Sequence, residues 1–259
     1  MQTNVKYVKI YKKAIKDDFM TCHIKKELTV LPSVCDNTAK ISIPSIFSVF
    51  MDIAAEHAQI LGVGSDEMQE KNLFWLTAKT KIKIHRRPEM MKKITVQTWP
   101  EAPERIRANR YYTLSCGDEI LVEGKSEWAI IGTEDGKLHR IDEVFPSEIE
   151  YYGNKVCDKP FSRMSDNFSD SEEKGTYTVR STDIDLGQHM NNASYIRAIF
   201  GMFSCKEIED INITEVEIHF KAPCFEGEKL SVKIKKTDGE TIISMIKEDG
   251  RTAVLARFS

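Results

Sequence analysis

Hydrophobic positions along this chain follow two periods, which alternate from one segment to the next. A spacing of i, i+3, i+4, i+7 is typical of an amphipathic helix, whereas alternation of apolar and polar residues is typical of a strand with one buried face. The helical spacing occurs in 44–62 and again from about 191 to 205, and alternating segments follow each stretch. We therefore predict two long helices, each followed by several antiparallel strands.

The predicted strands are short alternating runs that end at turn-forming residues such as Gly, Pro, Asp and Asn. They cover 22–30, 78–84, 94–99, 106–115, 120–132, 176–180, 216–220, 230–234, 241–247 and 252–258, with a further short strand at about 5–11. The segments 31–40 and 63–72 are predicted to be loops. Because a sheet with one apolar face needs an element that buries it, we expect each helix to lie inside the curve of a sheet. The predicted class is α+β.

The second half of the chain repeats the order of the first half. The sequence of 82–88 parallels that of 216–223 with one residue inserted, which favours an internal duplication. Between the halves, a stretch rich in Ser, Asp, Asn and Lys shows little periodicity and is typical of a linker. The predicted organisation is an N-terminal repeat at 1–145, a linker at 146–174 and a C-terminal repeat at 175–259.

The densest group of chemically active side chains lies just before the second helix, where Asp185, His189, Asn191 and Asn192 fall close together. A helix start offers unpaired N–H groups and the positive end of the helix dipole, which can hold a carbonyl oxygen that gains negative charge. A carboxylate beside such donors suits acyl transfer or hydrolysis. The alternative is that Asp185 is a turn or capping acid, although Asp183 fits that role better.

This run resembles the second-half active-site motif of the acyl-acyl carrier protein thioesterases, Asp-x-Asn-x-His followed by a small or apolar residue and Asn-Asn. Asp185, His189, Asn191 and Asn192 are in register, whereas Gly187 stands where the family generally has asparagine. The resemblance implies a tandem (double) hotdog fold, in which each repeat is a long helix wrapped by a curled antiparallel sheet. It also implies release of free fatty acid from acyl carrier protein, the step that terminates fatty acid biosynthesis.

The resemblance implies roles for individual residues. Asp185 would activate water or attack the thioester directly, and His189 would orient or polarise the reacting groups. Asn191 or Asn192 would cap the helix and help to fix the thioester, and Gly187 would lie at the substrate in place of asparagine. The family also has a cysteine considered as a nucleophile, which matches Cys224; an acid often precedes it, and Pro223 stands here instead. A small core residue is the alternative for Cys224.

Further residues are candidates for binding the substrate. Arg105, Arg107 and Arg110 could meet an acidic carrier protein, and Phe50 and Trp75 could line the acyl pocket, with an ordinary core position as the alternative. The alternating lysines from Lys79 to Lys83 could meet an acidic partner or form a solvated strand face. His57 closes the first helix in a run that also resembles the family, and we interpret it as a packed or capping residue.

Composition narrows the remaining choices. The formal net charge of −3 argues against nucleic acid as a partner, and no apolar run is long enough to span a membrane, so we expect a cytoplasmic protein. The six cysteines are scattered without a C-x-x-C pair, so we expect reduced thiols and no metal site. We expect no cofactor, since the substrate carries its own phosphopantetheine arm. The sequence does not fix the oligomeric state and allows a homodimer.

The sequence leaves three other functions open. An acyl-CoA thioesterase would share the fold and the chemistry. A hotdog dehydratase would use His189 as a base. A non-catalytic acyl-binding module is suggested by Gly187.

Overall fold

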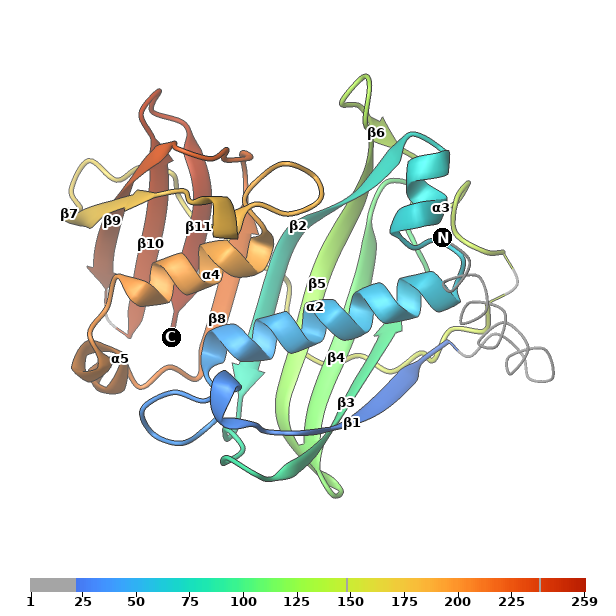
Figure 1. Cartoon of the computed structure of the whole chain (residues 1–259), viewed down its shortest axis with the longest axis horizontal. Coiled ribbons are helices and arrows are strands. Elements are labelled where there is room, and N and C mark those ends of the chain that lie inside the picture. Colours follow the sequence, from blue (N-terminus) through green and yellow to red (C-terminus); the bar gives the residue numbers. More distant parts are fainter. Residues whose placement is uncertain (1–21, 148, 238) are drawn as a thin grey trace.

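The computed structural model describes residues 22–147, 149–237 and 239–259. The strand predicted at 5–11 lies outside these residues. Figure 1 shows that the two long helices lie on the same face of one large sheet and that the N-terminal and C-terminal halves of the chain stand side by side. The predicted α+β class is confirmed.

The first half begins with an edge strand, continues with a long helix and then forms the rest of its sheet. Its elements are β1 (Ile24–Thr29), η1 (Pro32–Val34), α2 (Ile43–Ile60), α3 (Ser65–Glu70), β2 (Leu73–Ile84), β3 (Lys93–Pro100), β4 (Ala108–Cys116), β5 (Glu119–Gly132) and β6 (Leu138–His139). The second half has the same order. Its elements are β7 (Glu172–Thr178), η2 (Ser181–Asp183), α4 (Asn192–Gly201), α5 (Cys205–Ile211), β8 (Glu215–Phe220), β9 (Lys229–Thr237), β10 (Glu240–Lys247) and β11 (Thr252–Phe258).

The sequence did not indicate the two short helices α3 and α5. Helix α3 occupies a segment that we expected to be a loop, and the second long helix ends at Gly201 instead of about 205. Helices of six and seven residues are too short to show a hydrophobic period. The capping box between Ser204 and Glu207 at the start of α5 was the available signal.

The strands form one antiparallel sheet in the order β1-β3-β4-β5-β2-β8-β11-β10-β9-β7, with β6 paired to β5. Reading inward from either edge gives corresponding strands of the two halves, and the halves join where β2 pairs with β8. That pairing runs from Lys79 opposite His219 to Lys83 opposite Glu215. The two halves therefore share one continuous sheet.

The apolar core lies between the helices and the sheet and is shared by both halves. Helix α2 begins at the N-cap Ser42, whose side chain accepts a hydrogen bond from the Ser45 N–H, and its buried stripe includes Ile46, Phe47 and Phe50. The same cluster contains buried residues of α4 and of the second half of the sheet. Each large apolar side chain buried in this way contributes about 1.5–3 kcal/mol, so the two halves stabilise each other.

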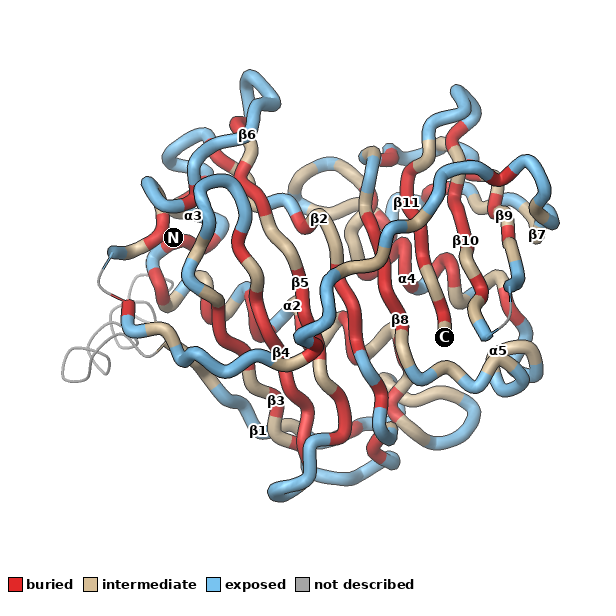
Figure 2. Tube along the Cα trace, turned by 180° about the vertical axis from the view of Figure 1, so that it is seen from behind, coloured by how far each residue is buried: buried red, intermediate tan, exposed pale blue. Residues whose placement is uncertain are grey.

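The segment that connects the halves, described over residues 149–171, crosses the face of the sheet opposite the helices (Figure 2). We call it the connecting segment. The Trp99 indole N–H donates to the Asn154 carbonyl at 2.7 Å, and Lys81 Nζ donates to the Lys159 carbonyl at 2.7 Å. The connecting segment therefore packs on both β2 and β3.

The interpretation of the lysines on β2 as a solvated strand face is wrong for Lys81. Lys83 is exposed, but Lys81 is only 2% exposed because the connecting segment lies over it. The Phe161 ring lies 5.4 Å from Lys81 Nζ and 5.5 Å from Lys125 Nζ. Alternation showed that one face of the strand is polar, but it could not show which segment covers that face.

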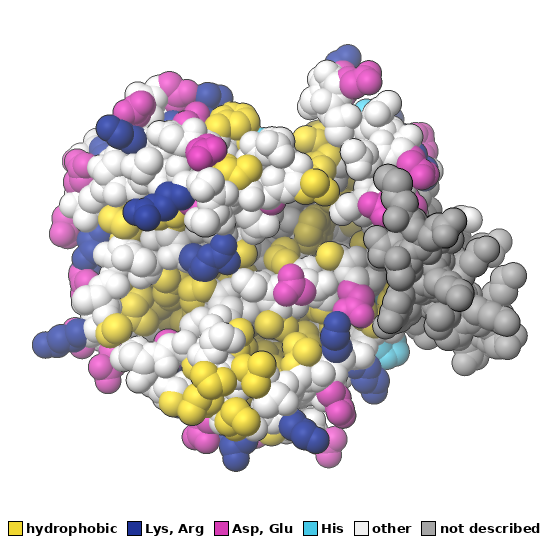
Figure 3. Space-filling view, in the orientation of Figure 1, with side chains coloured by type: hydrophobic (Ala, Val, Ile, Leu, Met, Phe, Trp, Pro, Cys, Tyr) yellow, Lys and Arg dark blue, Asp and Glu magenta, His cyan; other side chains and the backbone are white. Residues whose placement is uncertain are grey.

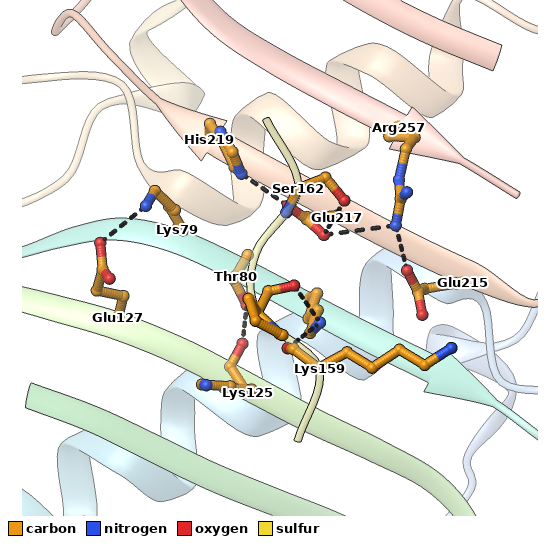
Figure 4. A network of polar contacts seen from close by, with 12 residues as sticks. Lys79, Thr80, Lys125, Glu127, Lys159, Ser162, Glu215, Glu217, His219 and Arg257 are labelled. Carbon is orange, nitrogen blue, oxygen red and sulfur yellow. Dashed lines mark hydrogen bonds and ion pairs between the residues drawn. The ribbon is translucent and has the colours of Figure 1, made fainter. Parts of the chain in front are cut away.

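Glu217 anchors the connecting segment to the second half (Figure 4). Its buried carboxylate accepts hydrogen bonds from the Ser162 N–H at 2.6 Å and from His219 Nε2 at 2.8 Å, and it lies 3.5 Å from Arg257 Nη2. Burial alone would raise the pKa of Glu217, but the hydrogen bonds from His219 and Ser162, with the charges of His219 and Arg257, hold that pKa below its ordinary value.

We predict that Glu217→Gln lowers the free energy of unfolding by about 2–3 kcal/mol at neutral pH, because the charge-assisted hydrogen bonds to Glu217 are lost. The loss is limited because Arg257 keeps Glu215 and Glu240 as partners. A carboxylate with a depressed pKa stabilises the fold above its ordinary pKa of 4.5, and this contribution is lost as the pH falls through the folded-state pKa. The free energies of unfolding of the native chain and the variant, measured in urea, should therefore converge as the pH is lowered.

The matched control is Glu173→Gln, on the exposed edge strand β7, which should change stability by less than about 0.5 kcal/mol. Equal stability of the native chain and Glu217→Gln at neutral pH would refute the anchoring role.

Candidate active site

The loop between η2 and α4, residues 184–191, carries most of the predicted site, and Asp183 holds the start of this loop in place. The buried Asp183 carboxylate accepts hydrogen bonds from the Arg180 N–H at 2.9 Å and from the Tyr177 hydroxyl at 2.7 Å. Its carbonyl oxygen accepts from the Asn191 N–H at 2.8 Å. The prediction of a capping role for Asp183 is confirmed, so this capping does not require Asp185.

Asp185 lies in a tight turn that its own carboxylate stabilises. The Asp185 N–H donates to the His189 carbonyl at 3.0 Å, and the Gln188 N–H donates to the Asp185 carbonyl at 3.0 Å. Asp185 Oδ1 accepts from the Gly187 N–H at 2.8 Å. Gln188 has a φ of 62°, which completes the reversal. This turn holds a half-buried carboxylate in a defined orientation beside His189.

Gly187 lies where the carboxylate and the imidazole come together. A Cβ added to Gly187 would lie 3.1 Å from both Asp185 Oδ1 and His189 Nδ1. Both groups therefore face the side of Gly187 that any other residue would fill with its side chain. Because Gly187 departs from the family motif, the space beside the acid and the imidazole holds no side chain from position 187.

Helix α4 begins immediately after this turn. Asn191 is the N-cap, and its Oδ1 accepts from the Ala193 N–H at 2.8 Å. The Ser194 and Tyr195 N–H groups donate to the Asn191 carbonyl. No acceptor for the Asn192 N–H is found among the described residues, so this group is free to donate to a ligand. The predicted capping by Asn191 is confirmed.

The first half of the chain supplies one wall of the site. Strand β2 pairs with β8 only from Lys79 onward, so its earlier residues extend past the end of β8. The Phe74 ring lies there, with its centroid 6.3 Å from that of His189. On the other side, the Phe225 ring centroid lies 5.8 Å from His189. The imidazole therefore has an aromatic neighbour from each half.

Apolar side chains are exposed around this position. Leu186 at the tip of the turn is 82% exposed, Phe225 is 47% exposed and Leu76 of β2 is 39% exposed. Figure 3 shows a hollow with hydrophobic surface between the two halves on the helix side of the molecule. Exposed apolar surface of this kind is typical of a binding site for an apolar ligand.

Cys224 lies behind the site and is fully buried. Its carbonyl accepts from the Met190 N–H at 2.8 Å, which links it to the residue after His189. Burial raises the pKa of the Cys224 thiol above its ordinary value, against smaller opposing effects of Tyr195 and Lys247. A buried thiol of raised pKa has little thiolate, so this placement favours a packing role.

The structure contradicts the prediction that Arg110 meets the carrier protein. Arg110 is buried, and its Nη1 donates to His57 Nδ1 at 2.9 Å and to Thr98 Oγ1 at 3.3 Å. Its position on β4 turns it toward helix α2, where burial lowers its pKa. Arg105 and Arg107 are exposed, although Arg107 lies 3.3 Å from Glu127. The packed role predicted for His57 is confirmed.

The two aromatic residues predicted for the acyl pocket lie in different apolar clusters. Phe50 is buried in the shared core and stacks on Tyr112 with a centroid distance of 4.8 Å. Trp75 is half-buried and donates its indole N–H to the Val63 carbonyl at 2.8 Å. Both packing contacts are those of core residues, and a role in lining the pocket stays a prediction.

Phe225 is one of the site residues that the sequence did not single out. A large apolar residue in a turn with Pro223 and Gly227, next to the candidate nucleophile Cys224, was the available signal.

Within the described residues, no group of three or more His, Cys, Asp or Glu side chains could hold a metal ion. None of the helices in that part of the chain is long and apolar enough to cross a membrane.

Comparison with known proteins finds relatives among the acyl carrier protein thioesterases. A plant acyl-[acyl-carrier-protein] hydrolase of Cuphea viscosissima is 26% identical over 203 residues, which is 73% of this chain and 48% of that protein. An oleoyl-acyl carrier protein thioesterase of Coriandrum sativum is 21% identical over 230 residues, which is 79% of this chain and 60% of that protein. Both are named chloroplastic, and this chain matches only about half of the length of such relatives.

Two solved structures share the fold. An acyl-ACP thioesterase from Bacteroides thetaiotaomicron superposes with a TM-score of 0.79 at 21% identity, covering 91% of this chain and 96% of that one. The 12:0-ACP thioesterase from Umbellularia californica also gives 0.79, at 19% identity, covering 92% and 96%. At this level of identity the likeness shows the fold alone.

Family models cover almost all of the described residues. The acyl-ACP thioesterase N-terminal domain matches residues 22–149, and the acyl-ACP thioesterase C-terminal domain matches residues 167–257. The second match contains the turn of Asp185 and His189 and the start of α4. The chain belongs to the acyl-ACP thioesterase family.

Proposed function

We propose that this protein hydrolyses the thioester of acyl-acyl carrier protein to free fatty acid and carrier. The observation that carries the proposal is the turn that brings Asp185 Oδ1 and His189 Nδ1 beside the open side of Gly187, directly before the start of α4. Family membership and the printed activities of the relatives support the substrate class.

The residues can be assigned to the steps of hydrolysis. Asp185 takes a proton from water as the water attacks the carbonyl carbon, or its carboxylate attacks first and gives a mixed anhydride that water then cleaves. The oxygen that gains negative charge would be held by the Asn192 N–H at the positive end of α4. The C–S bond breaks, and the leaving sulfur takes up a proton, for which His189 is the adjacent donor. Asn191 keeps the helix start in position.

The architecture fits two copies of one unit. We propose that the halves are tandem hotdog repeats from an internal duplication, with the first repeat at 1–145, a linker at 146–174 and the second repeat at 175–259. Each half has a long helix on a sheet, and the strand order is symmetric about the β2–β8 joint. The first repeat serves as scaffold and contributes Phe74 to the site, and the second carries the reacting groups.

The substrate would approach at the hollow on the helix side. The apolar side chains of Leu186, Phe225 and Leu76 would meet the pantetheine arm or the first carbons of the acyl chain. Arg105 and Arg107 remain candidates for contact with the acidic carrier. A homodimer, a cytoplasmic location and independence from cofactors stay predictions.

An acyl-CoA thioesterase is the alternative that shares every feature of this site, because CoA carries the same pantetheine arm. Hydrolysis of one acyl group presented on carrier protein and on CoA separates the two. We expect a kcat/KM at least tenfold higher on carrier protein. A preference for CoA would replace the proposed substrate, and binding of acyl carrier without turnover would favour a non-catalytic module.

We predict that Asp185→Asn lowers kcat by about 10²- to 10⁴-fold, because the variant loses the base while the amide oxygen can still accept from the Gly187 N–H. Release of fatty acid from carrier protein at saturating substrate measures this effect. Asp183→Asn is the paired control. It should lower the melting temperature, and its kcat should fall by much less than that of Asp185→Asn. Retention of native turnover by Asp185→Asn would remove Asp185 from the mechanism.

We predict that Gly187→Ala lowers kcat by about tenfold with little change in KM. Its Cβ would lie 3.1 Å from Asp185 Oδ1 and from His189 Nδ1, so one of these groups must move by a few tenths of an ångström. The control is Gly201→Ala, at the end of α4, where an added Cβ meets no atom within 4 Å. Equal kcat for both variants and the native chain would show that the close approach has no catalytic role.

We predict that Cys224→Ala retains kcat within about threefold, because the thiol is buried and its pKa is raised. Steady-state hydrolysis and the rate of alkylation by iodoacetamide test this placement together. A loss of kcat comparable with that of Asp185→Asn would restore Cys224 as the nucleophile.

A further inference from the structure

One buried cation lies behind the proposed site without a part in the mechanism above. The Lys247 side chain at the end of β10 is only 6% exposed. Its Nζ donates to the Pro223 carbonyl at 2.9 Å and lies 3.0 Å from Glu228 Oε2. It also lies 5.5 Å from the centroid of the Phe225 ring. All of these contacts fall on one segment, residues 223–228, between β8 and β9.

This segment, which we call the Phe225 loop, is held at two places. At its far end, the Gly227 N–H donates to the Val179 carbonyl at 2.9 Å, and the Val179 N–H donates to the Glu228 carbonyl at 2.9 Å. At its near end, Lys247 binds Pro223, and Glu228 Oε2 accepts from the Phe225 N–H at 3.1 Å. Lys247 and Glu228 therefore close the loop on itself around Phe225.

The Phe225 loop contacts the turn that carries Asp185 and His189 through two separate interactions. The Phe225 ring lies 5.8 Å from the His189 imidazole. The Cys224 carbonyl accepts from the Met190 N–H at 2.8 Å, and Met190 follows His189 in the chain. A shift of the loop would thus be transmitted both to the imidazole ring and to the backbone beside it.

Burying an ammonium group costs several kcal/mol unless its partners compensate, and an apolar residue of similar volume often stabilises a fold equally well. The fold alone therefore does not require a lysine here. We propose that Lys247, paired with Glu228, is a positioning residue that fixes the orientation of His189 through the Phe225 loop. The predicted effect of Lys247 on turnover rests on the proposed function, whereas its predicted effect on the orientation of the His189 imidazole does not.

The experiment compares Lys247→Met, which keeps the apolar stem and removes the ammonium, with Lys81→Met as the matched control. Lys81 is an equally buried lysine that donates to a backbone carbonyl, but it lies under the connecting segment. We expect Lys247→Met to lower kcat by about tenfold at nearly constant KM. Lys81→Met should lose stability to a similar degree and retain the native kcat.

A double-mutant cycle with Phe225→Ala tests the route of the effect. If Lys247 acts through Phe225, adding Lys247→Met to Phe225→Ala causes little further loss of kcat, because the ring that Lys247 positions is already absent. Multiplication of the two effects, or a native kcat for Lys247→Met, would overturn the proposal. Glu228→Gln, which keeps an acceptor for the Phe225 N–H but removes the charge, replaces Lys247→Met if that variant does not fold.

The imidazole resonances provide a readout that is independent of activity. The chain has six histidines, and His189→Gln assigns the resonance of His189 in the NMR spectrum of the full chain. We expect Lys247→Met to shift this resonance and Lys81→Met to leave it unchanged. An inactive native chain with a shifted His189 resonance would refute the proposed function and keep the positioning role, whereas an unshifted resonance would refute the positioning role.

Discussion

The antiparallel pairing of β2 with β8 is the constraint on which the site depends. Strand β2 runs from Leu73 to Ile84, but β8 covers only the five positions from Lys79 to Lys83. The remaining length of β2 extends past β8 and brings Phe74 within 6.3 Å of the His189 ring. The candidate site, whose proposed reacting groups come from the second half, thereby also has a side chain of the first half beside it.

The two faces of the sheet contribute to this joint in different ways. On the helix side, one apolar core runs through both halves and contains residues of α2 and α4. On the opposite side, the connecting segment binds Lys81 of β2 and Glu217 of β8 through buried polar contacts. Because buried polar groups are costly without partners, these contacts favour a single position of the connecting segment and hence a single register of the joint.

Most of the fold could be predicted from the sequence because its signal is periodic. The alternation at 78–84 and the helical stripe from Ile46 to Leu61 each depend on a face that is largely buried. The capping roles of Asp183 and Asn191 could also be predicted, since capping depends on neighbours in the chain. Local patterns of this kind need no knowledge of what lies across the fold.

Apart from the missed short helices α3 and α5 and the position at which α4 ends, the errors concern contacts between distant segments. Nothing local distinguishes the buried Arg110, which meets His57 from another element, from the exposed Arg107. The cover over Lys81 comes from residues 78 positions later in the chain. The same reasoning applies to Phe225, whose importance becomes visible only when its ring is placed against His189.

Photo-cross-linking tests most directly whether both halves build one substrate site. A carrier protein whose arm bears an acyl group with a diazirine near the thioester carbonyl would be bound to the full chain, irradiated and mapped by mass spectrometry. The account predicts label both in the peptide that contains Phe74 and in the peptide that contains Asp185 to Met190. Label confined to one half, or found on the sheet face beneath the connecting segment, would contradict it.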